Sequence, residues 1–157
     1  MSERGVVMAV CISSRKGTAK RDVGEARVVA GSGLEGDAHA GPWHRQVSLL
    51  AWESIARVRA RGLEVGPGDF AENITIKGLA LRSLPVGSKL QIGLEVLLEV
   101  TQIGKECHER CAVYRRIGDC IMPREGVFCR VLRGGTVKRG DQVVVLPATA
   151  GSTVGLV

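Results

Sequence analysis

The chain has 157 residues, 45% of them hydrophobic and 24% charged, a balance that excludes global disorder. Its longest apolar stretches fall far short of the roughly 20 residues of a membrane-spanning helix, and no signal-peptide pattern opens it, so we expect a cytoplasmic protein with no membrane partner. The net charge of +6 permits an anionic partner, but the basic residues are scattered and lack interleaved aromatics, which argues against nucleic acid.

The first half of the chain alternates short strands with loops. Val6–Ile12 is predicted as an opening strand and Glu25–Val29 as a second, shorter one. Gly31–Gly41 contains four glycines and is expected to be a loop. Across Val47–Arg61 apolar residues recur at helical spacing, which predicts a helix that ends at Gly62.

The second half adds more strands. Glu106–Met122 is ambiguous between short helices and loop. The pattern as a whole predicts a β-rich α+β fold: a mixed, mostly antiparallel β-barrel with a few short helices. We expect one domain over residues 5–147, followed by a flexible C-terminal tail at 148–157. The predicted strands are Asn73–Ile76, Lys89–Ile92, Glu95–Gln102, Gly126–Leu132 and Gln142–Leu146.

Five cysteines in a chain long enough to build its own core argue against a disulfide scaffold. Cys11 and Cys129 alternate with apolar residues inside predicted strands, so we expect them in the core. Cys107 follows a strong strand and stands two residues after Lys105. A positive neighbourhood lowers a thiol pKa, and the thiolate is both the nucleophile and the metal ligand, so Cys107 is the candidate reactive residue.

The remaining two cysteines, Cys111 and Cys120, are more typical of packing than of chemistry. Together with Cys107 and His108 they do contain metal-ligand atoms. Their spacing lacks a second paired unit, so zinc or an iron–sulfur cluster is only weakly indicated. Whether either thiol resolves a persulfide on Cys107 stays open.

Two polar stretches are further candidates. Backbone N–H groups between Gly33 and Gly41 can approach an anion, with Asp37 and His39 as polar handles, although the same pattern is typical of a structural turn. Asn73, at the entrance of a predicted strand, either satisfies backbone groups or binds a ligand.

Several of these stretches occur in one order along the chain. They are Gly36-Asp37-Ala-His39, Arg45-Gln-Val-Ser48-Leu, Gly68-Asp-Phe-Ala-Glu-Asn73-Ile-Thr75, Leu84-Pro-Val-Gly87, Leu90-Gln-Ile-Gly93, the strand before Cys107, and Gly126-Val-Phe with Gly134-Gly135 and Gly140-Asp141. In this combination, from about residue 5 to 147, the chain resembles the MOSC family, which is named for the C-terminal part of molybdenum cofactor sulfurase. The stretch Gly118–Gly126 resembles small stand-alone bacterial members.

The resemblance implies a β-barrel that binds molybdopterin or the molybdenum cofactor during cofactor maturation. It implies that Cys107 carries sulfur as a persulfide or ligates molybdenum. Lys105 and Arg124 would supply positive charge that relatives place elsewhere. The positions implied to bind the cofactor are Asp37, His39, Arg45, Ser48, Asn73, Lys105 and Arg124.

Three functions remain compatible with the resemblance. The first is sulfur transfer or molybdenum ligation through Cys107, with a cysteine desulfurase (a pyridoxal-phosphate enzyme fused to this domain in the sulfurases) or a molybdopterin-assembly protein as the partner. The second is a non-catalytic module that binds and delivers the cofactor. The third is a cofactor-dependent reductase of N-hydroxylated compounds. Whether the chain is an enzyme therefore stays open, and the basic surplus suits an anionic pterin ligand.

Overall fold

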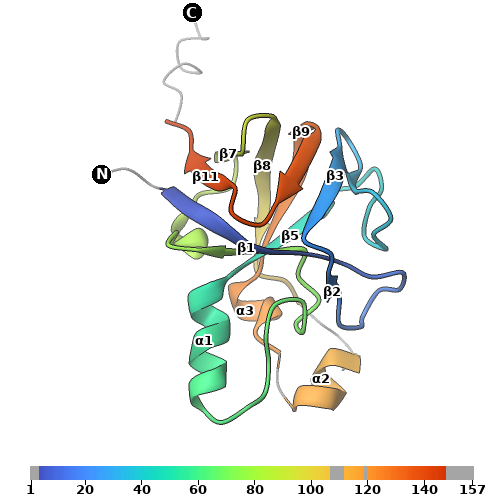
Figure 1. Cartoon of the computed structure of the whole chain (residues 1–157), viewed down its shortest axis with the longest axis vertical. Coiled ribbons are helices and arrows are strands. Elements are labelled where there is room, and N and C mark those ends of the chain that lie inside the picture. The colour runs from blue at the N-terminus through green and yellow to red at the C-terminus, as the bar shows by residue number, and fades with distance from the viewer. Residues whose placement is uncertain (1–3, 107–111, 119, 148–157) are drawn as a thin grey trace, which may run out of the picture.

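Strands that close into a mixed barrel form the centre of the structure (Figure 1). The computed structural model describes residues 4–106, 112–118 and 120–147. The strands are β1 (Arg4–Ile12), β2 (Arg21–Asp22), β3 (Glu25–Val29), β4 (Gly33–Leu34), β5 (Val47–Ala51), β6 (Ile74–Lys77), β7 (Lys89–Ile92), β8 (Val96–Ile103), β9 (Val127–Arg133), β10 (Gly135–Lys138) and β11 (Gln142–Val145). The helices are α1 (Trp52–Ala60), the 3-10 turn η1 (Leu81–Ser83), α2 (Ala112–Ile117) and α3 (Met122–Glu125).

The barrel closes because β1 pairs on one side with β6 and on the other with β11. Around the ring of described strands the order is β1, β6, β5, β9, β8, β7 and β11. All of these pairings are antiparallel except that of β5 with β6, which is parallel. A smaller sheet, in the order β10, β3, β4, lies beside the barrel. The predicted mixed, mostly antiparallel barrel with a few short helices is therefore confirmed.

Aliphatic side chains fill the barrel, because alternate residues of each strand point inward. The inward residues have almost no exposed surface, and this core cluster contains no aromatic side chain among the described residues. The most deeply buried include Leu49, Ile74, Ile76, Leu90, Ile92 and Leu98.

A second apolar cluster lies outside the barrel, where the helices gather below it in Figure 1. Ile55 and Val58 face inward from α1 and pack with Met122 of α3. Phe70 and Phe128, the two phenylalanines of the chain, both belong to this cluster. The helices therefore cover one end of the barrel and position the chain that leaves β8.

One predicted element is wrong in its first third. The helix predicted over Val47–Arg61 begins only at Trp52, and Val47–Ala51 forms β5. This segment lies between β9 and β6, so its first four residues are all buried and show no strand-like alternation. A run buried on both faces cannot be distinguished from a buried helix by periodicity alone. The short strands β2, β4 and β10 were not predicted.

The other strands were predicted within two residues of their ends. The segment left ambiguous contains α2, whereas α3 begins only at the last residue of that segment, Met122, and continues beyond it. Cys11 and Cys129 are both fully buried, as predicted, and Cys120 is half-buried against the helical cluster. The predicted tail, 148–157, lies outside the described residues. Among those residues, no helix combines the length and apolar character needed to cross a bilayer.

Candidate functional site

A buried ion pair between Lys20 and Asp37 lies beneath the glycine-rich loop. Lys20 Nζ donates to Asp37 Oδ1 at 2.8 Å, and neither side chain has exposed surface. Asp37 also accepts the backbone N–H groups of Ser13 and His39, each at 3.1 Å. Burial acts to raise the pKa of Asp37, but the hydrogen bond and charge of Lys20 outweigh it and lower that pKa. Asp37 is therefore a fixed anion inside the protein.

His39 continues this network toward the surface. Its Nδ1 lies 3.0 Å from Lys20 Nζ, and 22% of its side chain is exposed. Burial, followed by the charge of Lys20, lowers the pKa of His39 from 6.5 to about 4. Lys105 and Lys16 push it the same way, while Asp37 opposes them. His39 is therefore neutral at pH 7.

Trp43 stacks beside His39, and two cationic side chains lie against its ring. The two ring planes differ by 6° with centroids 6.3 Å apart, and Trp43 Nε1 donates to the His39 carbonyl oxygen at 2.8 Å. Lys16 Nζ and Arg45 Cζ lie 4.9 and 4.7 Å from the centroid of the Trp43 ring. Such cation–π contacts hold cations in place without neutralising them.

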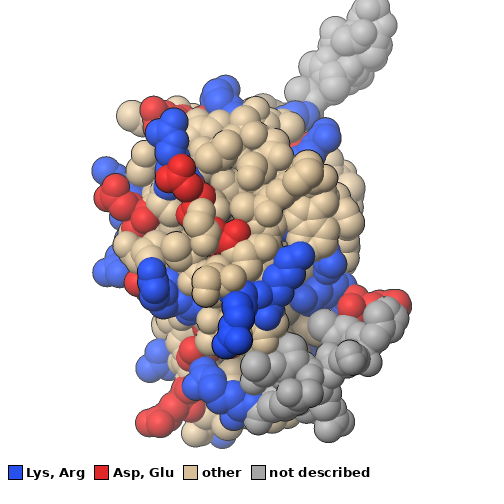
Figure 2. Space-filling view, turned by 90° about the vertical axis from the view of Figure 1, so that its right-hand side faces the viewer, with Lys and Arg blue, Asp and Glu red and all other residues tan. Residues whose placement is uncertain are grey.

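Arg45 lies against a second ring as well. Its Cζ is 5.6 Å from the centroid of Phe128, and Lys105 Nζ is 5.9 Å from the same centroid. Arg45 Nε is buried and has no hydrogen-bond partner in the described part of the chain. We call Lys16, Trp43, Arg45, Phe128 and Lys105 the cation–aromatic cluster. Figure 2 shows Lys and Arg side chains gathered near the middle of the face it presents.

Ser48 and Asn73 are both buried in the interior. Asn73 is fully buried, and its Nδ2 donates to the carbonyl oxygen of Cys11 at 3.0 Å. Its Oδ1 accepts the backbone N–H of Ser48 at 3.0 Å and the Ser48 hydroxyl at 3.2 Å. Asn73 also helps to lower the pKa of Asp37 through a side-chain hydrogen bond. Two roles were left open for Asn73. The structure shows that its side chain forms hydrogen bonds with backbone groups, and direct contact with a ligand stays a prediction.

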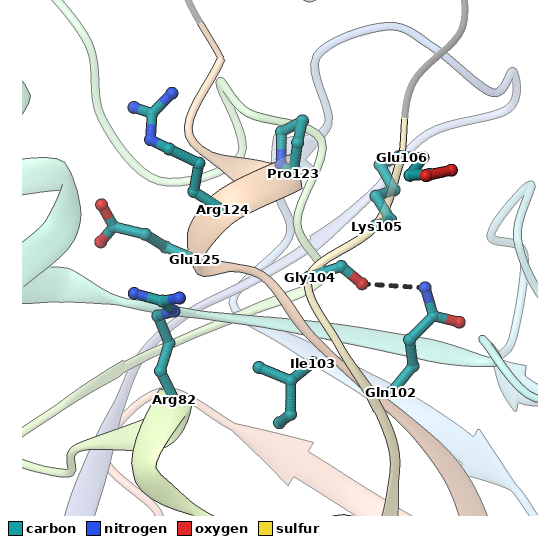
Figure 3. A pocket seen from close by; sticks show the side chains of 9 residues that line it. All are labelled: Arg82, Gln102, Ile103, Gly104, Lys105, Glu106, Pro123, Arg124 and Glu125. Atoms are coloured by element: carbon teal, nitrogen blue, oxygen red, sulfur yellow. Dashed lines mark hydrogen bonds between the residues drawn. The ribbon is translucent and has the colours of Figure 1, made fainter.

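Arg124 lies on an open depression of about 780 Å³ beside α3 (Figure 3). Arg82 and Lys105 contribute further positive charge to its lining. Gln102, also in the lining, donates to the Gly104 carbonyl oxygen at 2.8 Å. Because Lys105 belongs both to this lining and to the cation–aromatic cluster, the two surfaces share a border.

Cys107 and Cys111 lie outside the described residues, so the reactive role of Cys107 stays a prediction. The chain enters that segment through Lys105 and Glu106, both of which line the depression. The structure thus brings together Asp37, His39, Arg45 and Lys105. It buries Ser48 and Asn73, with Asn73 next to Asp37, and places Arg124 in the adjoining depression.

Four residues of the site were not predicted: Lys16, Lys20, Trp43 and Phe128. Trp43 carried a usable signal, since a tryptophan in a glycine-rich polar loop has few apolar neighbours in sequence to pack against. Lys20 carried none, because nothing in the sequence marks one lysine of a polar turn as fully buried.

The comparisons with known proteins agree with this fold. A family model described as "MOSC domain" matches residues 36–144. No curated protein matches. The YUAD protein from Bacillus subtilis superposes with a TM-score of 0.74 at 20% identity, covering 92% of this chain and 98% of that one. YiiM from Geobacillus stearothermophilus gives 0.71 at 20% identity, covering 94% and 78%. YiiM from Escherichia coli gives 0.64 at 20% identity, covering 95% and 71%. At such identities these structures establish a shared fold alone.

Proposed function

The chain belongs to the MOSC domain family, and on that premise we propose that it binds a molybdopterin-type cofactor and acts through Cys107. The family is linked to molybdenum cofactor binding. The observation that carries the proposal for this chain is the cation–aromatic cluster. Its three cations come from three separate segments and gather around two aromatic rings.

The donors of the cluster suit a phosphate-bearing, flat ligand. Arg45 Nε is a buried donor that lacks a protein acceptor in the described residues, and an anionic oxygen would satisfy it. Lys16 and Lys105 can neutralise further charge on such a group. The face of Trp43 offers apolar surface for a planar ring system. These residues would hold the cofactor, which when bound would supply a dithiolene-ligated molybdenum for oxygen-atom or sulfur chemistry.

Cys107 is the residue that we propose to react. In the sulfur-carrier role, its thiolate attacks the terminal sulfur of a persulfide on a cysteine desulfurase. A new S–S bond forms at Cys107, the old S–S bond breaks, and the donor cysteine leaves as a thiolate, so no external oxidant is needed. Lys105, two residues before Cys107 in the sequence, would favour the thiolate form. In the alternative role, the same thiolate ligates molybdenum, as a cofactor-dependent reductase of N-hydroxylated compounds would require.

A non-catalytic role is the second candidate, and one observation favours it. The residues of the cation–aromatic cluster contact one another directly, and Lys20, Asp37 and His39 form a connected network beside them. A site built in this way can bind and deliver a cofactor without thiol chemistry. A desulfurase or a molybdopterin-assembly protein is the partner expected in either case.

Intact-mass spectrometry separates the two candidates. The protein is incubated with a cysteine desulfurase and cysteine, and wild type is compared with Cys107→Ser and with Cys120→Ser as the matched cysteine control. Cys11 and Cys129 are fully buried, and burial raises their pKa values, so neither competes in the native protein. A gain of one sulfur atom that is lost only in Cys107→Ser supports the carrier role. No gain, with cofactor binding retained, supports the delivery module.

Cofactor binding is measured by tryptophan fluorescence. The chain has two tryptophans, so Trp52→Phe leaves Trp43 as the sole reporter and Trp43→Phe leaves Trp52. Titration with molybdopterin is expected to quench the first variant saturably and to leave the second unchanged. If the Trp43 emission does not respond and no binding is detected by calorimetry, the proposed function is wrong.

A further inference from the structure

The hydrogen bonds around Lys20 fix the hydrogen positions of their neighbours. Lys20 Nζ has three acceptors within hydrogen-bond distance: Asp37 Oδ1 at 2.8 Å, Ser13 Oγ at 3.0 Å and His39 Nδ1 at 3.0 Å. An ammonium group has three hydrogens and no lone pair, so it donates to all three. Ser13 fits this assignment because its hydroxyl hydrogen is already donated to the carbonyl oxygen of Arg15 at 2.8 Å.

The assignment leaves one possibility for the imidazole. If Nδ1 of His39 accepts from Lys20, it carries no hydrogen, and the hydrogen of the neutral ring is on Nε2. We propose that Lys20 is a positioning residue that locks His39 in the Nε2–H tautomer, so that the ring presents a hydrogen-bond donor beside the cation–aromatic cluster. Nε2 has no hydrogen-bond partner within the described residues, and the ring is partly exposed.

Lys20 opposes the effect that Asp37 by itself would have on the tautomer of His39. Asp37 Oδ2 lies 3.9 Å from Nδ1 of His39, too far for a hydrogen bond, but the charge of this carboxylate favours a hydrogen on that nitrogen. The ammonium of Lys20 stands nearer to Nδ1 and neutralises Asp37 at the same time. The lysine therefore determines which edge of the ring can donate.

The orientation of the His39 ring is also fixed. The backbone carbonyl oxygen of His39 accepts a hydrogen bond from Trp43 Nε1, and the imidazole plane is nearly parallel to the indole. A neutral N–H donor adds a directional hydrogen bond to a surface whose other donors, on Lys16, Arg45 and Lys105, all carry charge. The complementary ligand group is an acceptor atom such as a phosphate oxygen. This use of the donor rests on the proposed function, whereas the tautomer does not.

Nitrogen-15 NMR of the histidine rings tests the tautomer in the protein without ligand. The chain has only three histidines, so His44→Gln and His108→Gln assign the signals. In wild type we expect an unprotonated Nδ1 and a protonated Nε2 for His39 at pH 7. A hydrogen on Nδ1 overturns the proposal, and this reading needs no substitution of Lys20.

Substitution then tests the role of Lys20. In Lys20→Met we expect the hydrogen to move to Nδ1 and the pKa of His39 to rise from about 4 toward its ordinary 6.5. Lys20→Met leaves the buried carboxylate of Asp37 unpaired, which can prevent folding. A double variant that combines Lys20→Met with Asp37→Asn removes this charge. We expect it to fold and to leave the His39 ring free to carry its hydrogen on either nitrogen. Lys77→Met, an exposed lysine at the end of β6, is the control that should change neither property. An unchanged tautomer in the double variant overturns the role of Lys20.

Molybdopterin titration of the same variants separates this inference from the proposed function. We expect the folded double variant to bind about tenfold more weakly than Lys77→Met. Equal affinity, despite a changed tautomer, overturns the use of the Nε2 donor. If wild type has the expected tautomer but binds no molybdopterin, the proposed function fails while the tautomer lock stands.

Discussion

Asn73 Oδ1 accepts two hydrogen bonds from a single residue, the backbone N–H of Ser48 at 3.0 Å and the Ser48 hydroxyl at 3.2 Å. Ser48 lies in β5 and Asn73 directly precedes β6, so the amide joins the one parallel strand pair among the described strands. The same amide reaches β1 through the carbonyl oxygen of Cys11. One side chain thus connects three strands at the place where the antiparallel order of the barrel is broken.

Asn73→Ala is therefore expected to destabilise the fold strongly. It leaves the Ser48 N–H and the Cys11 carbonyl buried without partners, at about 1–3 kcal/mol each, so we expect about 3 kcal/mol less free energy of unfolding in urea. Ser48→Ala is the milder comparison at about 1 kcal/mol, because the Asn73 N–H still donates to the Ser48 carbonyl oxygen. Equal losses for the two variants would contradict the account.

Gly68 and Gly62 form a matched pair of glycine substitutions. Both have positive φ, +87° and +92°, so an alanine strains the backbone equally at either position. At Gly68 the new Cβ would overlap the Lys20 carbonyl oxygen and lie 3.1 Å from Cys11 Sγ, whereas at Gly62 it meets nothing within 4 Å. We expect Gly62→Ala to cost about 1 kcal/mol and Gly68→Ala at least about 3 kcal/mol more, measured by urea unfolding.

The depressed pKa of His39 predicts a loss of stability in mild acid. The unfolded chain binds a proton at His39 near pH 6.5, but the native protein binds it only near pH 4. As the pH falls through this window the proton favours the unfolded state, so the contribution of His39, up to about 3 kcal/mol, is lost.

The measurement is the difference in free energy of unfolding between wild type and His39→Gln from pH 7.5 to 4. Taking a difference is necessary because fully buried Glu72 acts in the opposite sense. Burial raises its pKa to about 7, so its contribution is lost as the pH rises through that value. A pH-independent difference would show that His39 titrates normally in the native state.

Arg45 should dominate binding of the phosphate-bearing ligand. Its guanidinium carbon lies 4.7 Å from the centroid of Trp43 and 5.6 Å from that of Phe128, and its buried Nε lacks an acceptor in the described residues. We expect Arg45→Gln to weaken molybdopterin binding by about tenfold or more, and Arg45→Lys to recover only part of it, because an ammonium has no planar fork to stack.

Arg130→Gln is the matched control for Arg45, since that exposed guanidinium is already paired with Glu99 at 2.6 Å. Affinities are read from Trp43 emission in the Trp52→Phe background. A loss of affinity as large for Arg130→Gln would mean that net charge, rather than this cluster, governs binding.

Much of the barrel could be read from local pattern. Lys89–Ile92 and Glu25–Val29 were predicted at their observed bounds, because β-branched residues and bordering glycines mark short strands clearly. The stretch Val47–Ala51 could not be assigned in this way. Its neighbours on both sides come from distant parts of the chain, β9 and β6, and they, not its own sequence, make it a strand.

The residues of the site likewise fall into two groups, those that local sequence marks and those that only the tertiary structure brings to the site. Asp37, His39 and Arg45 lie close together in the sequence, in a stretch whose glycines, polar side chains and motif order mark it as a candidate. Lys20, Lys105 and Phe128 come from three other segments, and only closure of the barrel places them against that stretch.

The sequence by itself determined the fold class, the family and the chemical types available to the site, because strand pattern, composition and ordered motifs are properties of residues near one another in the chain. Tertiary structure alone decided the electrostatic state of those residues. Burial of His39, together with the nearby charges of Lys20, Lys105 and Lys16, keeps that ring neutral, and the buried Nε of Arg45 has no hydrogen-bond partner among the described residues. Charge and desolvation depend on distances between segments far apart in sequence, which no local pattern encodes.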